Sequence, residues 1–390
     1  MTLYLNPRAD RRLKLGHLWI YSNEVNTKRS PLKSFEAGSL VQVSSDSGQA
    51  LGQAFVHPNA LLCGRLVSRD VDEAVDEAFF IKCFTRALQL RERCFTEPYY
   101  RLVYGDSDEL PGLVVDRFGD HLVVQVSVAG MAEREALWVS ALQTVLPHKG
   151  MLICTNHSAN AIEQLAPETK IVGDMPDRIE VLENTCRFEI DPLKGQKTGW
   201  FYDHRLNRAR LQAWVANSDV LDVFSYLGGW GIQAVAAGAS KVTCVDASQS
   251  AIDGVLKNAE LNRVQNKVSA LKGKAVDVLK QLVQEKKQFD CVVLDPPAFI
   301  KKRKDQKSGE AAYRHLNELA LRLLRPGGLL VSASCSMTLQ ANTLTDIVHA
   351  AARHQHRSAQ LIYTGTQGPD HPIHPMIPET AYLKALFFRA

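Results

Sequence analysis

The fold of this chain is decided by Val220-Leu-Asp-Val-Phe-Ser-Tyr-Leu-Gly-Gly-Trp-Gly-Ile-Gln-Ala234 and by the run that follows it, Lys241-Val-Thr-Cys-Val-Asp246. The first five residues are largely apolar and predict a buried strand, the glycines predict a tight turn, and the residues after them predict the start of a helix. The second run predicts another buried strand. Strand, glycine turn, helix and strand in this order are typical of the βαβ unit that opens a parallel sheet.

Asp246 stands where the second predicted strand ends. A carboxylate at the carboxyl edge of a parallel sheet can accept hydrogen bonds from both hydroxyls of a ribose. The glycine turn lets the backbone approach a ligand, and the amino end of the helix favours negative charge. The sequence therefore predicts a ligand that contains a ribose. Because Gly229-Trp-Gly-Ile-Gln-Ala234 also fits the dinucleotide fingerprint G-x-G-x-x-A, a nicotinamide cofactor is the alternative at this point.

A third apolar run, Phe289 to Leu294, leads into Asp295-Pro-Pro-Ala-Phe299. Hydride transfer has no need of an Asp-Pro-Pro segment at a strand end, so this segment disfavours the nicotinamide cofactor. The order of glycine turn, acidic strand end and Asp-Pro-Pro-x-Phe resembles class I S-adenosylmethionine-dependent methyltransferases. The resemblance implies a Rossmann-like α/β domain, with Asp246 at the ribose of S-adenosylmethionine and the Asp-Pro-Pro edge facing the target base.

Composition limits the remaining possibilities. The 390 residues suit two or three domains, and 45% hydrophobic with 23% charged residues is typical of a globular protein. The net charge of +4 is compatible with nucleic-acid binding without indicating it. No apolar run approaches the length of a membrane helix and Met1 begins no signal-peptide pattern, so we expect a soluble, cytoplasmic protein without membrane contact. The eight cysteines contain no C-x-x-C pair, and no metal is expected.

Three domains are expected along the chain. Residues 1–71 contain short predicted strands between Gly and Ser turns, and Gly16-His-Leu-Trp-Ile-Tyr-Ser-Asn-Glu24 resembles the PUA domain, a compact RNA-binding barrel. Residues 72–190 predict an α+β central domain, in which the segment 101–120 closely resembles the RlmI-type family of ribosomal RNA cytosine-C5 methyltransferases. Residues 191–390 are expected to form the S-adenosylmethionine-dependent methyltransferase domain.

The stretch Gln196-Lys-Thr-Gly-Trp-Phe-Tyr-Asp-His-Arg205 matches the Gln-Lys-Thr-Gly-x-Phe-x-Asp-x-Arg pattern that lines the cofactor pocket in this family. An ordinary connection from hairpin to helix is the alternative explanation. Residues 268–277 predict the next strand, and the family usually has an acidic residue where Lys274 stands. Because lysine cannot accept a hydrogen bond from the adenine amino group, Asp277 or a backbone group is expected to do so. The cofactor-binding residues that the resemblance implies are Gln196, Lys197, Thr198, Phe224, Ser225, Gly228, Asp246, Ala247, Asp277 and Asp295.

Cys335 ends the predicted strand that follows Pro326-Gly-Gly. C5 of a pyrimidine is too weak a nucleophile to accept a methyl group until a thiolate adds at C6, so this chemistry needs a cysteine beside the base. The sequence resembles the RlmI-type layout with one nucleophile, Cys335, and with Asp295 holding the polar edge of the base; these two are the expected catalytic residues. A buried cysteine with no chemical role is the alternative.

The resemblance implies large-subunit (23S) ribosomal RNA as the substrate, 5-methylcytosine as the product and S-adenosyl-L-methionine as the cofactor. The expected RNA-contacting residues are Pro296, Pro297, Phe299 and the basic run Lys301, Lys302, Arg303 and Lys304, which could neutralise phosphates. Two other functions stay open: methylation of an exocyclic nitrogen, which would not need Cys335, and RNA binding without catalysis. Whether the chain forms a homodimer also stays open.

Overall fold

The computed structural model describes residues 1–155, 160–196 and 198–390, and the chain forms two compact units. The first unit consists of residues 1–177, 192–199 and 369–380, and the second of residues 178–191, 200–368 and 381–390. Each unit therefore contains segments from distant parts of the sequence. Within the described ranges, no helix has both the length and the apolar character that crossing a membrane requires.

The first unit begins with a five-stranded sheet in the order β1-β3-β4-β5-β2. The strands are β1 Thr2–Tyr4, β2 Trp19–Tyr21, β3 Ser39–Ser44, β4 Ala50–Val56 and β5 Leu62–Ser68, and the short helix α1 spans Asp10–Lys14. Only the β1–β3 pair is parallel. Alternating apolar residues such as Val41 and Val43 turn inward and fill a core of their own, as the short predicted strands require.

A second sheet of this unit has the order β10-β9-β8-β7-β6. Its strands are β6 Tyr99–Tyr104, β7 Leu113–Phe118, β8 His121–Val126, β9 Gly150–Cys154 and β10 Thr169–Gly173. The helices are α2 Glu77–Cys94, α3 Ala129–Ala132, α4 Glu135–Val145 and α5 Asn160–Glu163. The helix α2 begins after the cap residue Asp76 and buries Phe80 and Phe84 against this sheet.

The second unit is built on a seven-stranded sheet in the order β15-β14-β13-β16-β17-β19-β18. Its strands are β13 Asp219–Val223, β14 Lys241–Asp246, β15 Val268–Lys272, β16 Phe289–Leu294, β17 Leu324–Ser334, β18 Gln360–Gly365 and β19 Lys384–Arg389. The strands β13 to β17 run parallel, and β19 pairs antiparallel with both β17 and β18. The predicted α/β fold is confirmed.

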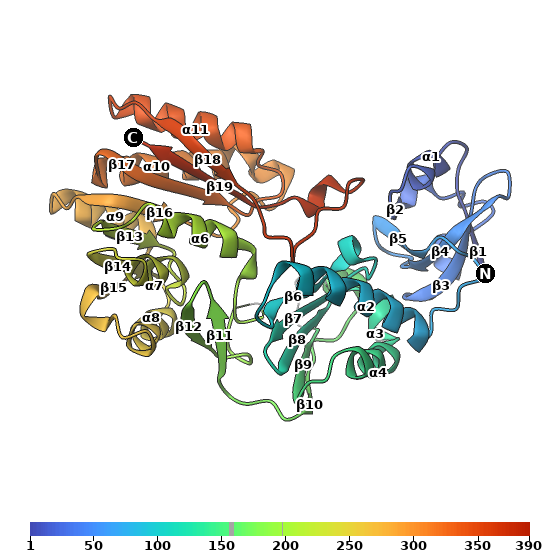
Figure 1. Cartoon of the computed structure of the whole chain (residues 1–390). Coiled ribbons are helices and arrows are strands. Elements are labelled where there is room, and N and C mark those ends of the chain that lie inside the picture. The colour runs from blue at the N-terminus through green and yellow to red at the C-terminus, as the bar shows by residue number, and fades with distance from the viewer. Residues whose placement is uncertain (156–159, 197) are drawn as a thin grey trace. The chain divides into compact units, whose positions relative to one another are not determined.

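Helices cover both faces of this sheet (Figure 1). They are α6 Arg205–Gln212, α7 Gly229–Ala236, α8 Gln249–Leu261, α9 Ala275–Gln284, α10 Gln306–Leu323 and α11 Ala341–His354. One core lies between the sheet and α9, α10 and α11, and another lies between the sheet and α6, α7 and α8. Sheets buried on both faces need strands that are apolar almost throughout, which explains the continuous apolar runs of the sequence.

The hairpin of β11 Ile179–Glu183 and β12 Cys186–Ile190 clusters with the second unit and contacts α7 and α8. Its turn residues Asn184 and Thr185 have φ angles of +49° and +69°, the left-handed conformations that a two-residue hairpin turn favours. On α8, Asn258 Oδ1 accepts a hydrogen bond from the backbone N–H of Glu189 at 2.8 Å. This bond joins the hairpin to the helix that follows the proposed ribose carboxylate.

One predicted element was wrong. The strand expected over residues 268–277 ends at Lys272, and Asp277 lies in the first turn of α9 instead. Lys274 precedes that helix as its cap residue, and its carbonyl accepts a hydrogen bond from the Asp277 N–H at 2.9 Å. The apolar positions of this segment fit both periods over so short a stretch, so the pattern alone could not separate the strand from the helix.

Candidate active site

Four loops of the second unit leave the same edge of its sheet. Because β13, β14, β16 and β17 are parallel, the residues after their carboxyl ends meet there: Phe224 after β13, Asp246 at the end of β14, Asp295 after β16 and Cys335 after β17. From β13 the chain continues to β14 and β15 on one side, and then crosses to β16 and β17 on the other side of β13. Ligands of open α/β sheets bind at such a switch point.

The loop after β13 has an unusual backbone. Phe224 and Tyr226 have φ angles of +66° and +47°, and Gly228 follows with a φ of +83°. Non-glycine residues in this region cost free energy, and such residues cluster where a ligand is held. The N–H groups of Phe224 and Ser225 both donate to the carbonyl of Val245, at 2.9 and 3.0 Å, so the neighbouring strand holds the loop in this shape.

Asp246 is oriented by two backbone amides. Its Oδ2 accepts a hydrogen bond from the N–H of Tyr226 at 3.0 Å, and its Oδ1 accepts one from the N–H of Ser248 at 2.9 Å. Each carboxylate oxygen can accept a second bond, so both oxygens keep capacity for a pair of hydroxyls. Gly228 has a φ of +83°, a left-handed conformation that favours glycine at this turn. These features fit the ribose end of S-adenosylmethionine.

Asp222 lies inside the sheet directly beneath this turn and is fully buried. Its Oδ2 accepts a hydrogen bond from the N–H of Gly231 at 2.9 Å, at the start of α7. Burial raises the pKa of Asp222 to about 7, although the Gly231 bond opposes the rise. A Cβ at Gly231 would come within 2.8 Å of the Cys244 sulfur, so glycine is what allows α7 to approach the strands this closely.

Asp295 is held by two side chains that the sequence alone did not single out. Trp230 donates its indole N–H to Oδ2 at 3.0 Å, and His204 Nε2 lies 3.2 Å from Oδ1, within ion-pair distance. Burial alone would raise the pKa of Asp295, but the charge and hydrogen bond of His204 and the Trp230 bond outweigh it and lower the pKa below its usual value. For His204, burial alone would lower the pKa, but the charge and hydrogen bond of Asp295 outweigh burial, and the pKa of His204 is raised. The Asp295 side chain stays 23% exposed and therefore accessible.

Cys335 lies beside the Asp-Pro-Pro segment. Its sulfur is 4.0 Å from the carbonyl oxygen of Pro296, the distance of a weak S–H···O hydrogen bond. On α10, the hydroxyl of Tyr313 contacts those of Ser334 and Ser336 at 2.8 and 3.1 Å, so both neighbours of the cysteine are tied to the helix. The structure thus brings together two segments that the sequence separates by 39 residues.

Two arginines of the helix α6 lie beside a buried carboxylate, that of Glu183. Glu183, the last residue of β11, is buried. It accepts hydrogen bonds from Arg208 at 2.6 and 3.0 Å, from the Trp200 indole at 2.9 Å and from Gln233 at 2.9 Å. Arg205 lies 3.6 Å away. The charge of Arg208 is therefore paired with that of Glu183 inside the protein. Both partners sit in ordinary-looking charged stretches, so no sequence signal marked the pair.

The other predicted site residues differ in exposure. Among the expected cofactor-binding residues, Ser225 and Thr198 are buried, Phe224 is half-buried, and Gln196, Ala247 and Asp277 are exposed; Lys197 lies outside the described residues. Gln196 and Thr198 belong to the first unit and the others to the second. In the Asp-Pro-Pro segment Pro296 is buried and Pro297 exposed, and the Phe299 ring packs against Tyr313 at 5.0 Å. Lys301, Lys302, Arg303 and Lys304 are all exposed.

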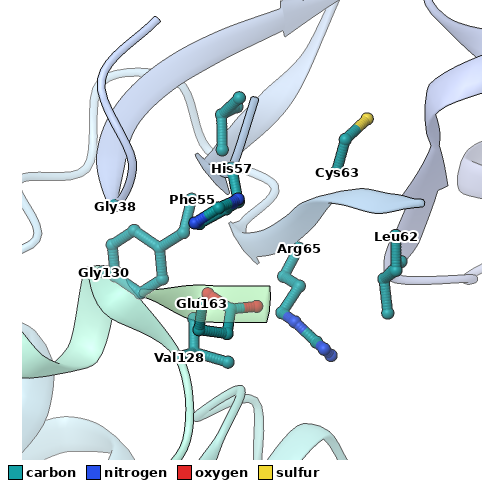
Figure 2. A pocket seen from close by; sticks show the side chains of 10 residues that line it. Gly38, Phe55, His57, Leu62, Cys63, Arg65, Val128, Gly130 and Glu163 are labelled. Atoms are coloured by element: carbon teal, nitrogen blue, oxygen red, sulfur yellow. The ribbon is translucent and has the colours of Figure 1, made fainter. Parts of the chain in front are cut away.

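The first unit also contains a small hollow (Figure 2). It is lined by residues of β4 and β5 such as Phe55 and Arg65, and by Val128 and Glu163. Its empty volume of about 200 Å³, open solvent included, is below the roughly 300–1,000 Å³ of ligand pockets. His57 and Arg65 both line the hollow, and among the described residues neither His57 Nε2 nor Arg65 Nε has a hydrogen-bond partner. A hollow with two such polar atoms suits solvent better than an apolar ligand.

Comparison with known proteins agrees with this geometry. Residues 156–389 match the S-adenosylmethionine-dependent methyltransferase family, and residues 3–69 match the PUA-like domain family. A protein of Aliivibrio fischeri named ribosomal RNA large subunit methyltransferase I is 32% identical, covering 100% of this chain and 99% of that protein. A protein of Tolumonas auensis with the same name is 33% identical, with the same coverage.

Solved structures show the same fold. A Streptococcus mutans protein described as a S-adenosylmethionine-dependent methyltransferase superposes with a TM-score of 0.84 at 20% identity, and each chain is fully covered. A methyltransferase solved in complex with S-adenosylhomocysteine superposes with a TM-score of 0.86 at 20% identity, again over both whole chains. The predicted cofactor, S-adenosylmethionine, is confirmed by the family match. The chain belongs to the S-adenosylmethionine-dependent methyltransferases and, within them, to the family of the ribosomal RNA large subunit methyltransferase I proteins.

Proposed function

We propose that this protein methylates C5 of a cytosine in large-subunit (23S) ribosomal RNA, through a covalent adduct between Cys335 and C6 of the base. The name of the full-length relatives supports ribosomal RNA as the substrate. The observation that carries the cytosine chemistry is the position of Cys335, whose sulfur lies 4.0 Å from the Pro296 carbonyl at the edge where Asp246 and Asp295 also stand. Methylation of an exocyclic nitrogen would use the Asp-Pro-Pro edge and would leave this cysteine without a role.

The proposed reaction begins and ends with the free thiolate of Cys335. The thiolate lone pair forms the S–C6 bond, and the electron pair of the C5–C6 double bond becomes available at C5 for the methyl group. When bound, S-adenosylmethionine would supply that methyl group, with its methyl–sulfur bond broken and S-adenosylhomocysteine as the leaving group. A general base then takes the proton from C5, the C5–C6 double bond returns, and the S–C6 bond breaks to restore the thiolate. Asp295, held ionised by His204 and Trp230, would accept a hydrogen bond from the exocyclic amine of cytosine.

The cofactor contacts are part of the same proposal. The two oriented oxygens of Asp246 would hold the ribose, with Ser225, Gly228 and the rest of the strained loop at the methionine end. Asp277, exposed near the start of α9, would accept a hydrogen bond from the adenine amino group, and Ala247, which follows Asp246, would also contact the cofactor. Gln196, Lys197 and Thr198 stay predicted cofactor-binding residues, on the family pattern alone.

For RNA we propose two contributions. The barrel of residues 1–71 would bind a structured part of the RNA, and the exposed basic run after Phe299 would neutralise phosphates near the target base. The borders at 71 and 190, which separate barrel, central domain and methyltransferase domain, stay predictions.

The test is methyl transfer from radiolabelled S-adenosylmethionine to ribosomal RNA, followed by nucleoside analysis, for the wild type and for C335A. We expect 5-methylcytidine from the wild type and none from C335A, because without the thiolate C5 is not activated. C291A is a matched control, since Cys291 is a buried cysteine of β16 in the same sheet. If C335A still methylates RNA, the nitrogen-methylation alternative replaces the proposal.

Calorimetry with S-adenosylhomocysteine separates the enzyme from an RNA-binding protein without catalysis. We expect binding to the wild type and roughly tenfold or more weaker binding to D246N, because an amide accepts only through one oxygen. Absence of binding to the wild type would contradict an enzymatic role.

A further inference from the structure

Lys384 is the first residue of β19, and it lies opposite Ser334 in the antiparallel pair of β17 and β19. Cys335 follows Ser334 directly, so the register places the lysine at the strand end where the proposed nucleophile stands. The side chain is buried, with the residue only 7% exposed. A lysine is almost never buried to this degree unless a partner compensates its charge.

The contacts of Lys384 are to backbone carbonyls. Its Nζ donates to the carbonyl of Ser336 at 2.6 Å and to that of Tyr382 at 2.8 Å. Among the ion pairs of the described ranges, none joins Lys384 to a carboxylate. Carbonyl groups satisfy N–H donors but supply no opposite charge, and a buried ammonium without an anion is costly. The position therefore calls for a negative group close to β17.

The titratable groups around Lys384 leave one residue for that role. Tyr313 of α10 is tied to Ser334 and Ser336, and burial raises the pKa of its hydroxyl, which keeps it neutral. The hydroxyl of Tyr382 donates to Asp203, so that carboxylate is already engaged. Burial lowers the pKa of Lys384 to about 8, and Cys335 is the group whose charge opposes this decrease.

We propose that Lys384 is a positioning residue that keeps Cys335 in its thiolate form, with the thiolate serving as the counter-ion of the buried ammonium. The role rests on the proposed function, in which Cys335 attacks C6. The ammonium of Lys384 and the thiolate of Cys335 have opposite charges and stabilise each other. The lysine therefore favours loss of the cysteine proton, and the thiolate favours retention of the lysine proton. The nucleophile is then ready near neutral pH without a separate base to activate it.

The test follows alkylation of Cys335 by iodoacetamide as a function of pH, with each cysteine peptide quantified by mass spectrometry. In K384M we expect the midpoint of the Cys335 profile to rise by about one pH unit or more, and alkylation at pH 7 to slow about tenfold, because only the thiolate reacts. Cys94, which is exposed, is the internal reference in every sample and should not change. K241M is the matched control, since Lys241 begins another strand of the same sheet but is exposed and paired with Asp219.

An unchanged Cys335 midpoint in K384M overturns the proposal. A second measurement covers the case in which K384M does not fold. Because the coupling is reciprocal, C335A should lower the pKa of Lys384 below its wild-type value of about 8. At about pH 6.5, where most of the wild-type lysine is protonated, acetic anhydride should then acylate Lys384 several-fold faster in C335A than in the wild type. Equal rates in C335A and the wild type also overturn the proposal.

Failure of the positioning role of Lys384 can be distinguished from failure of the proposed methyltransferase function. Alkylation and acylation report on the Lys384–Cys335 pair without RNA or cofactor, whereas methyl transfer by C335A reports on the proposed function. Methyl transfer by K384M adds a third readout: if the lysine acts through the thiolate, the lost activity recovers as the pH rises toward 9, because the thiolate then forms without help. A loss that is equal at every pH contradicts the positioning role.

Discussion

Trp230 of α7 donates its indole N–H to Asp295 at the end of β16, across 65 positions of sequence. The bond joins the glycine turn of the cofactor site to the segment that we propose holds the target base. It also fixes one oxygen of Asp295 while His204 faces the other.

Removing this donor should impair catalysis more than folding. In W230F the Asp295 oxygen loses a hydrogen bond to a charged group, which is worth about 1.5–3 kcal/mol, and we expect methyl transfer to fall about tenfold or more. Steady-state rates, with thermal unfolding alongside, measure the two effects. W214F is the control, because Trp214 is 37% exposed on the second unit. Equal loss of activity in both variants would argue against a specific role for the Trp230–Asp295 bond.

Replacing Glu183 should destabilise the second unit strongly. E183Q leaves Arg208 buried without its counter-charge, and breaking such a pair typically costs about 3–5 kcal/mol. The free energy of unfolding from urea titrations measures the effect. E180Q is the matched control on the same hairpin, since the Glu180–Arg187 pair is largely exposed and should contribute less than about 1 kcal/mol.

The pair of Glu183 and Arg208 also predicts how the free energy of unfolding changes at low pH. Burial alone would raise the pKa of Glu183, but the charges of Arg208 and Arg205 lower it below the ordinary 4.5. A carboxylate with a lowered folded-state pKa stabilises the protein above its unfolded pKa, and this contribution is lost as the pH falls through the folded-state value. Wild-type stability should therefore fall more steeply below about pH 4.5 than that of E183Q. Parallel curves for the two proteins would contradict the prediction.

Asp222 predicts the opposite dependence. Its pKa rises from 3.8 to about 7 in the folded protein, so between these values the folded state keeps a proton that the unfolded state loses. The free energy of unfolding should then decrease as the pH rises through this window, by on the order of 4 kcal/mol. D222N cannot ionise and can still accept the Gly231 bond, so it should gain stability over the wild type between pH 4 and pH 8. D253N, at an exposed position of α8, should show no such gain.

The basic run should matter for RNA and not for the cofactor. K301A combined with K304A removes two exposed charges, and we expect weaker binding of a ribosomal RNA fragment with a salt dependence that is lower by about 0.7–0.9 for each lost phosphate contact. Filter binding across a salt series measures this slope. K286A with K287A removes two exposed charges elsewhere in the same unit and should leave the slope unchanged. Similar slopes in the two double variants would indicate that the run does not contact phosphates.

Local patterns in the sequence determined most of the fold. The apolar run before the glycines is β13, the helix predicted after the glycine turn is α7, and the run that ends at Asp246 is β14. Because parallel strands share their carboxyl edge, these patterns were also enough to place Asp246, Asp295 and Cys335 along one edge. Short segments were less certain, and residues 268–277 were assigned to the wrong element at their end.

Only the tertiary structure decided which side chains meet at that edge. Glu183 and Arg208, or Trp230 and Asp295, are ordinary residues in ordinary local patterns, and their pairing depends on how helices and loops pack after the chain has folded. Lys384 depends on the register of the antiparallel β17–β19 pair, where a shift of one residue would move its side chain to the other face of the sheet. Local periodicity specifies elements, whereas contacts between distant residues depend on packing and register, which no single stretch of sequence contains.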